Sequence, residues 1–169
     1  MKTVLIVDGY NVIGAWKQAE KENLSIAESR ERLTHILEDY AGYTGEQVIL
    51  VFDGYQSDRL QRSEEKHGNL TLVYTKHAET ADSYIERVTA QMPKYYEIRV
   101  VTSDLLEQSQ VFSTGAIRVS SAELLRDLSA TRNKGISQHT NTIKEKYRLE
   151  EHLSEETLKA LESIRRQED

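Results

Sequence analysis

Residues 4–16 read VLIVDGYNVIGAW, in which four apolar residues precede an aspartate, a glycine, a tyrosine and an asparagine, and a second apolar run follows. The first run is rich in β-branched residues and has no polar alternation, which is typical of a strand buried on both faces. Such strands belong to parallel sheets. The stretch therefore predicts a buried strand that ends on Asp8, with Gly9 allowing the backbone to turn away sharply.

Further apolar runs have the length and the β-branched content of strands. With the first, the expected strands are residues 3–7, 47–52, 70–74, 98–102 and 117–119. Helical patterns lie between them, because capping residues precede apolar residues at helical spacing. The start signals are the capping boxes at 25–28 and 120–123 and the cap residues Thr80 and Ser103, and the stop signals are Gly45, Pro93 and Gly115. This alternation predicts a three-layer α/β fold with a central, mainly parallel sheet flanked by helices.

Length and composition indicate a single domain in the cytoplasm. The 169 residues suffice for one sizeable core. The chain has no cysteine, which excludes disulfides, thiolate metal sites and cysteine nucleophiles and fits a reducing compartment. No run of about 18 apolar residues is present and the N-terminus lacks the pattern of a secretory signal, so we expect no membrane association.

The C-terminal part differs in character from the rest. After Ser129 the sequence ATRNKGISQHTN is polar and is expected to form a loop or a mobile arm, and residues 154–164 are expected to form a helix. We interpret residues 1–130 as the main domain. Residues 131–169 are interpreted as a basic loop and a C-terminal helical extension that packs on the same domain.

Charge is unevenly distributed along the chain. The formal net charge is −6, yet residues 118–148 contain seven basic and three acidic side chains, a net charge of +4. An acidic body with a basic region fits a phosphate-binding surface beside a carboxylate metal site, and a solvated helical face is the alternative explanation. The candidates for contact with a nucleic-acid strand are Tyr10, which can stack on a base, and the basic residues Arg118, Arg126, Arg132 and Lys134, which can contact phosphates.

Four aspartates fall where predicted strands end or predicted helices begin. Asp8 and Asp53 directly follow strands, Asp104 follows the strand at 98–102, and Asp82 lies in the first turn of a helix. The ligand site of an open parallel sheet lies beyond the carboxyl ends of its strands, so these acids are expected at one edge. Each aspartate alone has a structural explanation, because aspartate is favoured at helix starts and turns.

Four acids at one edge would repel one another unless some are protonated or a cation lies among them. Oxygen ligands without cysteine or a histidine cluster suit Mg²⁺ or Mn²⁺, which would activate a water and stabilise charge on a phosphodiester. Asn11 can hold a carboxylate or a metal-bound water. Glu79, Glu86 and Ser103 are further candidates, although Glu86 also fits a solvated helix residue and Ser103 an N-cap.

These motifs resemble the NYN-domain ribonucleases of the PIN-like superfamily, and most closely their YacP-like branch in Firmicutes. The matching segments are LIVDGYNVIGAW, YAGYTGEQVILVFDGY, YTKHAETADSYIE, VVTSDLLEQ and GAIRVSSAELL. The resemblance implies a PIN-like α/β fold with a metal-dependent nuclease centre, in which Asp8, Asp82 and Asp104 are the core acids and Asn11 and Asp53 support them. It further implies cleavage of mRNA during translation, with the 70S ribosome as a partner.

Two other classes of protein are alternatives to an endoribonuclease. One is a non-catalytic RNA- or ribosome-binding adaptor with the same fold, against which the near-complete set of acids counts. The other is a phosphatase or phosphoacceptor of the doubly wound class. A phosphatase of the haloacid-dehalogenase type would have a second aspartate where this chain has Tyr10, and a receiver domain would have a lysine near Thr102. We therefore expect a Mg²⁺- or Mn²⁺-dependent endoribonuclease.

Overall fold

The computed structural model describes residues 1–54, 60–102, 115–135 and 159. The chain divides into two compact units, Met1–Thr131 and Arg132–Asp169. Within the described residues, no helix has both the length and the apolar character needed to cross a membrane. The described strands and the described acidic candidates all belong to the first unit.

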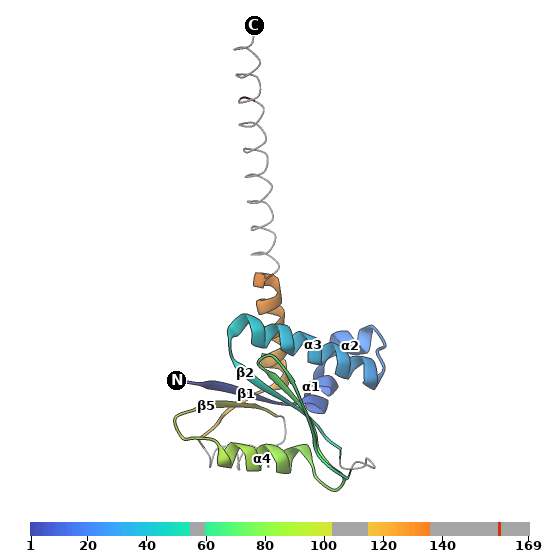
Figure 1. Ribbon diagram of the computed structural model, residues 1–169. Coiled ribbons are helices and arrows are strands. Elements are labelled where there is room, and N and C mark those ends of the chain that lie inside the picture. The colour runs from blue at the N-terminus through green and yellow to red at the C-terminus, as the bar shows by residue number, and fades with distance from the viewer. Residues whose placement is uncertain (55–59, 103–114, 136–158, 160–169) are drawn as a thin grey trace, which may run out of the picture. The chain divides into compact units, whose positions relative to one another are not determined.

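The described part of the first unit contains a six-stranded sheet (Figure 1). Its strands are β1 (Thr3–Asp8), β2 (Gln47–Phe52), β3 (Ser63–His67), β4 (Leu70–Tyr74), β5 (Glu97–Val101) and β6 (Ile117–Val119). Their spatial order is β3-β4-β2-β1-β5-β6, and all neighbours are parallel except the antiparallel pair β3 and β4. The order of the strands therefore reverses between β1 and β5, which is where ligands bind in open α/β sheets.

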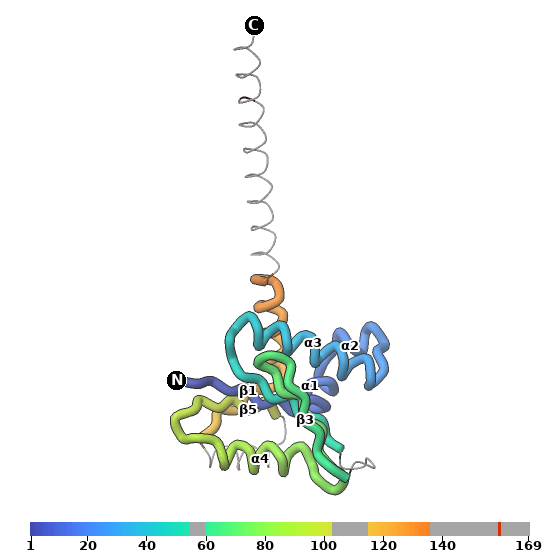
Figure 2. Tube along the Cα trace, viewed as in Figure 1, coloured from blue at the N-terminus to red at the C-terminus, as the bar shows by residue number. Residues whose placement is uncertain are grey.

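The five strands predicted from the sequence are confirmed, with bounds that shift by no more than one residue at either end. The sixth strand, β3, was not expected, because its sequence SEEKH contains no apolar residue. It lies at the edge of the sheet and pairs along its whole length with β4 (Figure 2). Charged residues are common on edge strands, where they discourage pairing with other chains.

The described helices lie between β1 and β2, between β4 and β5, and after β6. They are α1 (Gly9–Ala15), α2 (Lys17–Lys21), α3 (Ile26–Thr44), α4 (Ala81–Gln91) and a helical segment at residues 121–135. The predicted start signals of three helices are confirmed. Ser25 and Glu28 form a reciprocal capping box before α3, Ser120 and Glu123 form another before residue 121, and the Thr80 side chain caps α4.

Helices cover both faces of the sheet and complete the three layers that the sequence predicts (Figure 1). On one face, Leu5 and Val7 of β1 belong to the core that includes residues of α1, α2, α3 and the segment at 121–135. On the other face, Val4 and Ile6 pack with residues of α4. All four β1 side chains are at most 1% exposed, so the strand is buried on both sides, as its uninterrupted apolar run indicates.

The prediction of a loop after Ser129 is wrong for residues 130–135, which are helical. Residues 130–135 continue the helix that begins at residue 121, because no proline interrupts the backbone and polar side chains fit an exposed helix surface. Residues 136–141 of that loop and the helix expected from Ser103 lie outside the described residues. So does the C-terminal helix, apart from Lys159, which is helical.

Candidate functional site

Two aspartates mark the carboxyl ends of neighbouring strands. Asp8 is the last residue of β1 and is paired with Val51 of β2, and Asp53 directly follows Phe52 at the end of β2. Both aspartates are half-buried. Because β1 and β2 are parallel, the two residues lie at the same edge of the sheet, where α/β proteins bind their ligands.

Asp8 also caps α1, and its surroundings are fixed by hydrogen bonds. The backbone N–H of Asn11 donates to Oδ1 of Asp8 over 3.4 Å. The hydroxyl of Ser121 donates to Oδ1 of Asn11 over 2.9 Å, which sets the orientation of the Asn11 amide. Ser121 is buried and begins the helical segment that follows β6. The sequence analysis missed Ser121, because no local pattern connects two residues 110 positions apart.

The chain changes direction after Asp8, where the strand gives way to a helix, but this change does not use a positive φ at Gly9. The strand β1 leads directly into α1, and the described residues with positive φ do not include Gly9. The glycine instead permits a close approach, because a Cβ at this position would lie 2.4 Å from Cε1 of Phe52. Gly9 is therefore needed for packing between α1 and the end of β2.

Aromatic rings lie beside the two aspartates. The ring centroid of Tyr10 is 5.1 Å from that of Phe52, and Phe52 stacks on Tyr74 at 5.5 Å. The guanidinium of Arg30 donates to the Tyr10 hydroxyl over 2.9 Å, and this hydrogen bond raises the pKa of Arg30. Tyr10, a candidate for base stacking, is half-buried and contacts the protein through both its ring and its hydroxyl.

Two of the remaining candidate acids lie in α4. Asp82 is half-buried in the first turn of α4, and Glu86, one turn further on, is exposed. Asp104 and Ser103 lie outside the described residues. Thr102, the last residue described before them, follows β5, whose Val101 is paired with Val7 of β1. In the part of the chain that the structure describes, no three acidic, histidine or cysteine side chains gather as a metal-binding group.

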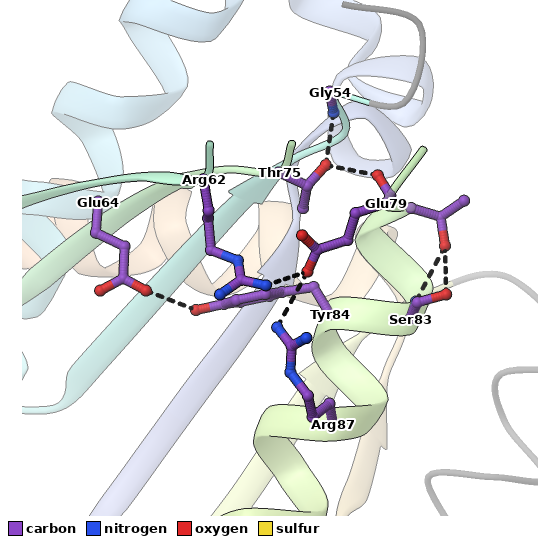
Figure 3. Close-up of polar contacts among 9 residues, drawn as sticks. Gly54, Arg62, Glu64, Thr75, Glu79, Ser83, Tyr84 and Arg87 are labelled. Carbon is purple, nitrogen blue, oxygen red and sulfur yellow. Dashed lines mark hydrogen bonds and ion pairs between the residues drawn. The ribbon is translucent and has the colours of Figure 1, made fainter. Parts of the chain in front are cut away.

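Glu79 is held by two arginines (Figure 3). Its carboxylate is 8% exposed, and Oε1 accepts from Nη2 of Arg62 at 2.5 Å and from Nη2 of Arg87 at 3.0 Å. Its other oxygen, Oε2, is buried and has no hydrogen-bond partner among the described residues. Burial raises the pKa of Glu79, but the two guanidinium groups outweigh that effect and hold the pKa below its ordinary value. Glu79 is therefore an ionised carboxylate with its charge offset inside the protein.

A buried threonine connects the end of β2 to the start of α4 (Figure 3). The hydroxyl of Thr75 accepts a hydrogen bond from the N–H of Gly54 over 2.7 Å. The same hydroxyl donates to the backbone carbonyl of Glu79 over 2.8 Å. The segment after Asp53 and the segment before Asp82 are thus joined through one side chain.

The basic candidates are distributed over both units. Arg118 of β6 is half-buried, and its Nε donates to the carbonyl of Thr102 over 3.3 Å. Arg126 is exposed on the helical segment of the first unit. Arg132 and Lys134 are exposed helical residues of the second unit.

The donor types at this edge suit a hard divalent cation. Asp8, Asp53 and Asp82 offer carboxylate oxygens and Asn11 an amide, with no thiolate in the chain. Oxygen donors of this kind fit Mg²⁺ or Mn²⁺ better than softer metals. The residues present are therefore compatible with the metal that the family resemblance implies.

Comparison with known proteins places the chain in a family. A family model described as the YacP-like NYN domain matches residues 5–166. The chain belongs to the YacP-like NYN domain family. A relative from Bacillus subtilis (strain 168), described as uncharacterized protein YacP, is 38% identical over 166 residues, which are 96% of each chain.

Solved structures agree with this YacP-like assignment. The crystal structure of Rae1 (YacP) from Bacillus subtilis matches with a TM-score of 0.72 and 37% identity, over 96% of this chain and 94% of that one. The crystal structure of a mutant of the same Bacillus subtilis protein matches with a TM-score of 0.70 and 35% identity, over 85% and 84% of the two chains. The YacP-like chain therefore has the nuclease-like PIN fold, and PIN-like nuclease domains generally use divalent metals.

Proposed function

We propose that the protein is a Mg²⁺- or Mn²⁺-dependent endoribonuclease that cleaves mRNA phosphodiester bonds on translating ribosomes. The observation that carries the proposal is the position of Asp8, Asp53 and Asp82. The first two end parallel neighbours in the sheet, and the third opens the helix after β4. Carboxylates at this edge of a nuclease-like family domain are suited to phosphodiester hydrolysis.

The acids have distinct proposed roles. Asp8, Asp82 and Asp104 are the proposed metal ligands and catalytic residues, and Asp53, Glu79, Glu86 and Ser103 support them. A bound ion would supply an activated water and stabilise charge on the phosphodiester. The chain itself holds Asp8 through a hydrogen bond from the backbone N–H of Asn11. The Ser121 hydroxyl fixes the Asn11 amide beside it.

The proposed partners are mRNA and the 70S ribosome. The RNA- or ribosome-binding residues are proposed to be Tyr10, Arg118, Arg126, Arg132 and Lys134. Guanidinium groups suit phosphate because they form paired hydrogen bonds with its oxygens. The exposure of Arg126, Arg132 and Lys134 supports this role.

A reconstituted translation system with Mg²⁺ tests the proposal. Wild-type protein is expected to cut a translated mRNA at specific positions, and to leave it intact when initiation is blocked. The Asp82→Asn variant is expected to give no cuts, because one ligand of the metal is lost. If the mRNA stays intact under active translation while the wild-type protein sediments with ribosomes, the protein is an adaptor and not a nuclease.

A further inference from the structure

Asp53 and Asp82 come from two separate connections of the first unit. Asp53 follows β2, whereas Asp82 lies in the first turn of α4, after the connection that follows β4. Carboxylates placed around one cation, whether they bind it or support its ligands, repel one another in its absence, so other contacts must hold them in place. Neither the sheet nor the helix alone fixes the separation of these two residues.

The hydroxyl of Thr75 supplies one such contact. Thr75 is completely buried, and its backbone N–H donates to the carbonyl of Phe52 over 3.1 Å. Its hydroxyl accepts from Gly54, the neighbour of Asp53, and donates to the carbonyl of Glu79, three residues before Asp82. Both hydrogen-bonding roles of the hydroxyl are therefore used to connect the segments that carry the two acids.

The side chain of Glu79 supplies the second contact (Figure 3). It joins Arg62, which precedes β3, to Arg87 of α4. The guanidinium carbons of the two arginines lie 4.8 Å and 5.5 Å from the ring centroid of Tyr84, a buried residue of α4. The segment before α4 is thus held in two ways. Thr75 bonds to the backbone carbonyl of Glu79, and the two arginines pair with the Glu79 carboxylate.

We infer that Thr75 and Glu79 are positioning residues, which set the placement of Asp53 and Asp82 for a divalent cation. This inference rests on the proposed function, because it concerns the same acids, Asp8, Asp53 and Asp82. Thr75 acts through backbone groups and Glu79 through two arginines. In this role the ion pairs of Glu79 hold the start of α4, the helix that carries Asp82.

Binding of Mn²⁺ to the full chain, followed by the electron paramagnetic resonance signal of the free ion, tests the inference without relying on catalysis. Thr75→Val keeps the shape of the side chain but removes the hydroxyl that bonds to the N–H of Gly54 and to the carbonyl of Glu79. The expected result is a Mn²⁺ dissociation constant raised at least about tenfold, the usual effect of losing a group that orients metal ligands. Thr75→Ser, which retains the hydroxyl, is expected to bind Mn²⁺ like the wild type.

Thr89→Val is the matched control. Thr89 is a buried residue of α4 whose hydroxyl donates to the carbonyl of Ile85 over 2.7 Å, within the same helix. It is expected to lose stability without losing Mn²⁺ affinity, and thermal unfolding of each variant separates the two effects. If Thr75→Val does not fold, Glu79→Gln provides the test, with weakened binding of Mn²⁺ expected because its ion pairs with the arginines are weakened.

The outcomes distinguish the inference from the proposal on which it rests. Wild-type affinity in Thr75→Val, or in Glu79→Gln where that variant is used, would overturn the positioning role and leave the nuclease proposal standing. An equal loss of affinity in Thr89→Val would also overturn it, because the effect would then be general destabilisation. A wild-type chain that binds no Mn²⁺ would contradict the proposed function, and the positioning role with it.

Discussion

Substitution of Gly9 by alanine tests the packing of α1 against Phe52, beside Asp8 and Asp53. The added Cβ would lie 2.4 Å from Cε1 and 2.6 Å from Cδ1 of Phe52. The Phe52 ring is fully buried, with Tyr10 at 5.1 Å and Tyr74 at 5.5 Å, so it has little room to move. Overpacking a core costs about 1–3 kcal/mol, and contacts this short place the cost at the upper end, about 3 kcal/mol. In a helix interior alanine is favoured over glycine by roughly 0.5–1 kcal/mol, and Gly9 is the first residue of α1, so this is the most that alanine can regain. The net loss is therefore at least about 2 kcal/mol.

Urea unfolding followed by circular dichroism measures this loss. With a denaturant slope of about 2 kcal/mol per molar urea, the midpoint of Gly9→Ala should fall by at least about 1 M. Gly14→Ala is the control, because Gly14 lies in the same helix and an added Cβ meets no atom within 4 Å. Its midpoint should stay constant or rise. An unchanged midpoint for Gly9→Ala would refute the close approach of α1 to Phe52.

Three further predictions concern charged residues. Because the folded pKa of Glu79 is lowered, its contribution to stability is present above its ordinary pKa and is lost as the pH falls through the folded pKa. Glu79→Gln should therefore flatten the acid part of a plot of the urea midpoint against pH. Arg99→Met should destabilise the protein by roughly 3–5 kcal/mol in thermal unfolding, since it leaves the buried Glu46 carboxylate without its 2.7 Å ion pair. An unchanged melting temperature would contradict this. Reversal of Arg126 and Arg132 to glutamate should weaken cosedimentation with ribosomes and reduce its salt dependence, whereas an unchanged salt slope would leave both as ordinary surface residues.

Much of the fold could be predicted from sequence because its signals are local. The apolar run that forms β1 has no polar alternation, and burial on both faces follows from that pattern alone. The start of α3 is encoded in the four residues from Ser25 to Glu28, and its end in Gly45, which has a φ of 72°. In each case a few neighbouring side chains determine the backbone.

Elements without a local signal were missed. The strand β3 is formed by charged residues and depends on its pairing with β4, which supplies the hydrogen bonds. The helices α1 and α2 have seven and five residues, too few for a clear helical period. The sequence explained Gly9 by backbone freedom, whereas the structure uses its missing side chain to accommodate the ring of Phe52, 43 positions along the chain.

The candidate site shows the same division. That Asp8 and Asp53 share an edge follows from two predicted parallel strands and needs no knowledge of side-chain contacts. The contacts that hold the site were not predictable, because they join distant segments. Ser121 donates a hydrogen bond to Asn11, 110 positions away, and Glu79 accepts one from Arg62, 17 positions earlier.

The rate of mRNA cleavage by Asp8→Asn during active translation is the decisive measurement. Asp39→Asn provides the matched control, because Asp39 is an exposed aspartate of α3. We predict that Asp8→Asn folds and sediments with ribosomes as the wild type does but cuts no mRNA, while Asp39→Asn cuts at the wild-type rate. Cleavage by Asp8→Asn at the wild-type rate would contradict a catalytic centre at the carboxyl edge of the sheet.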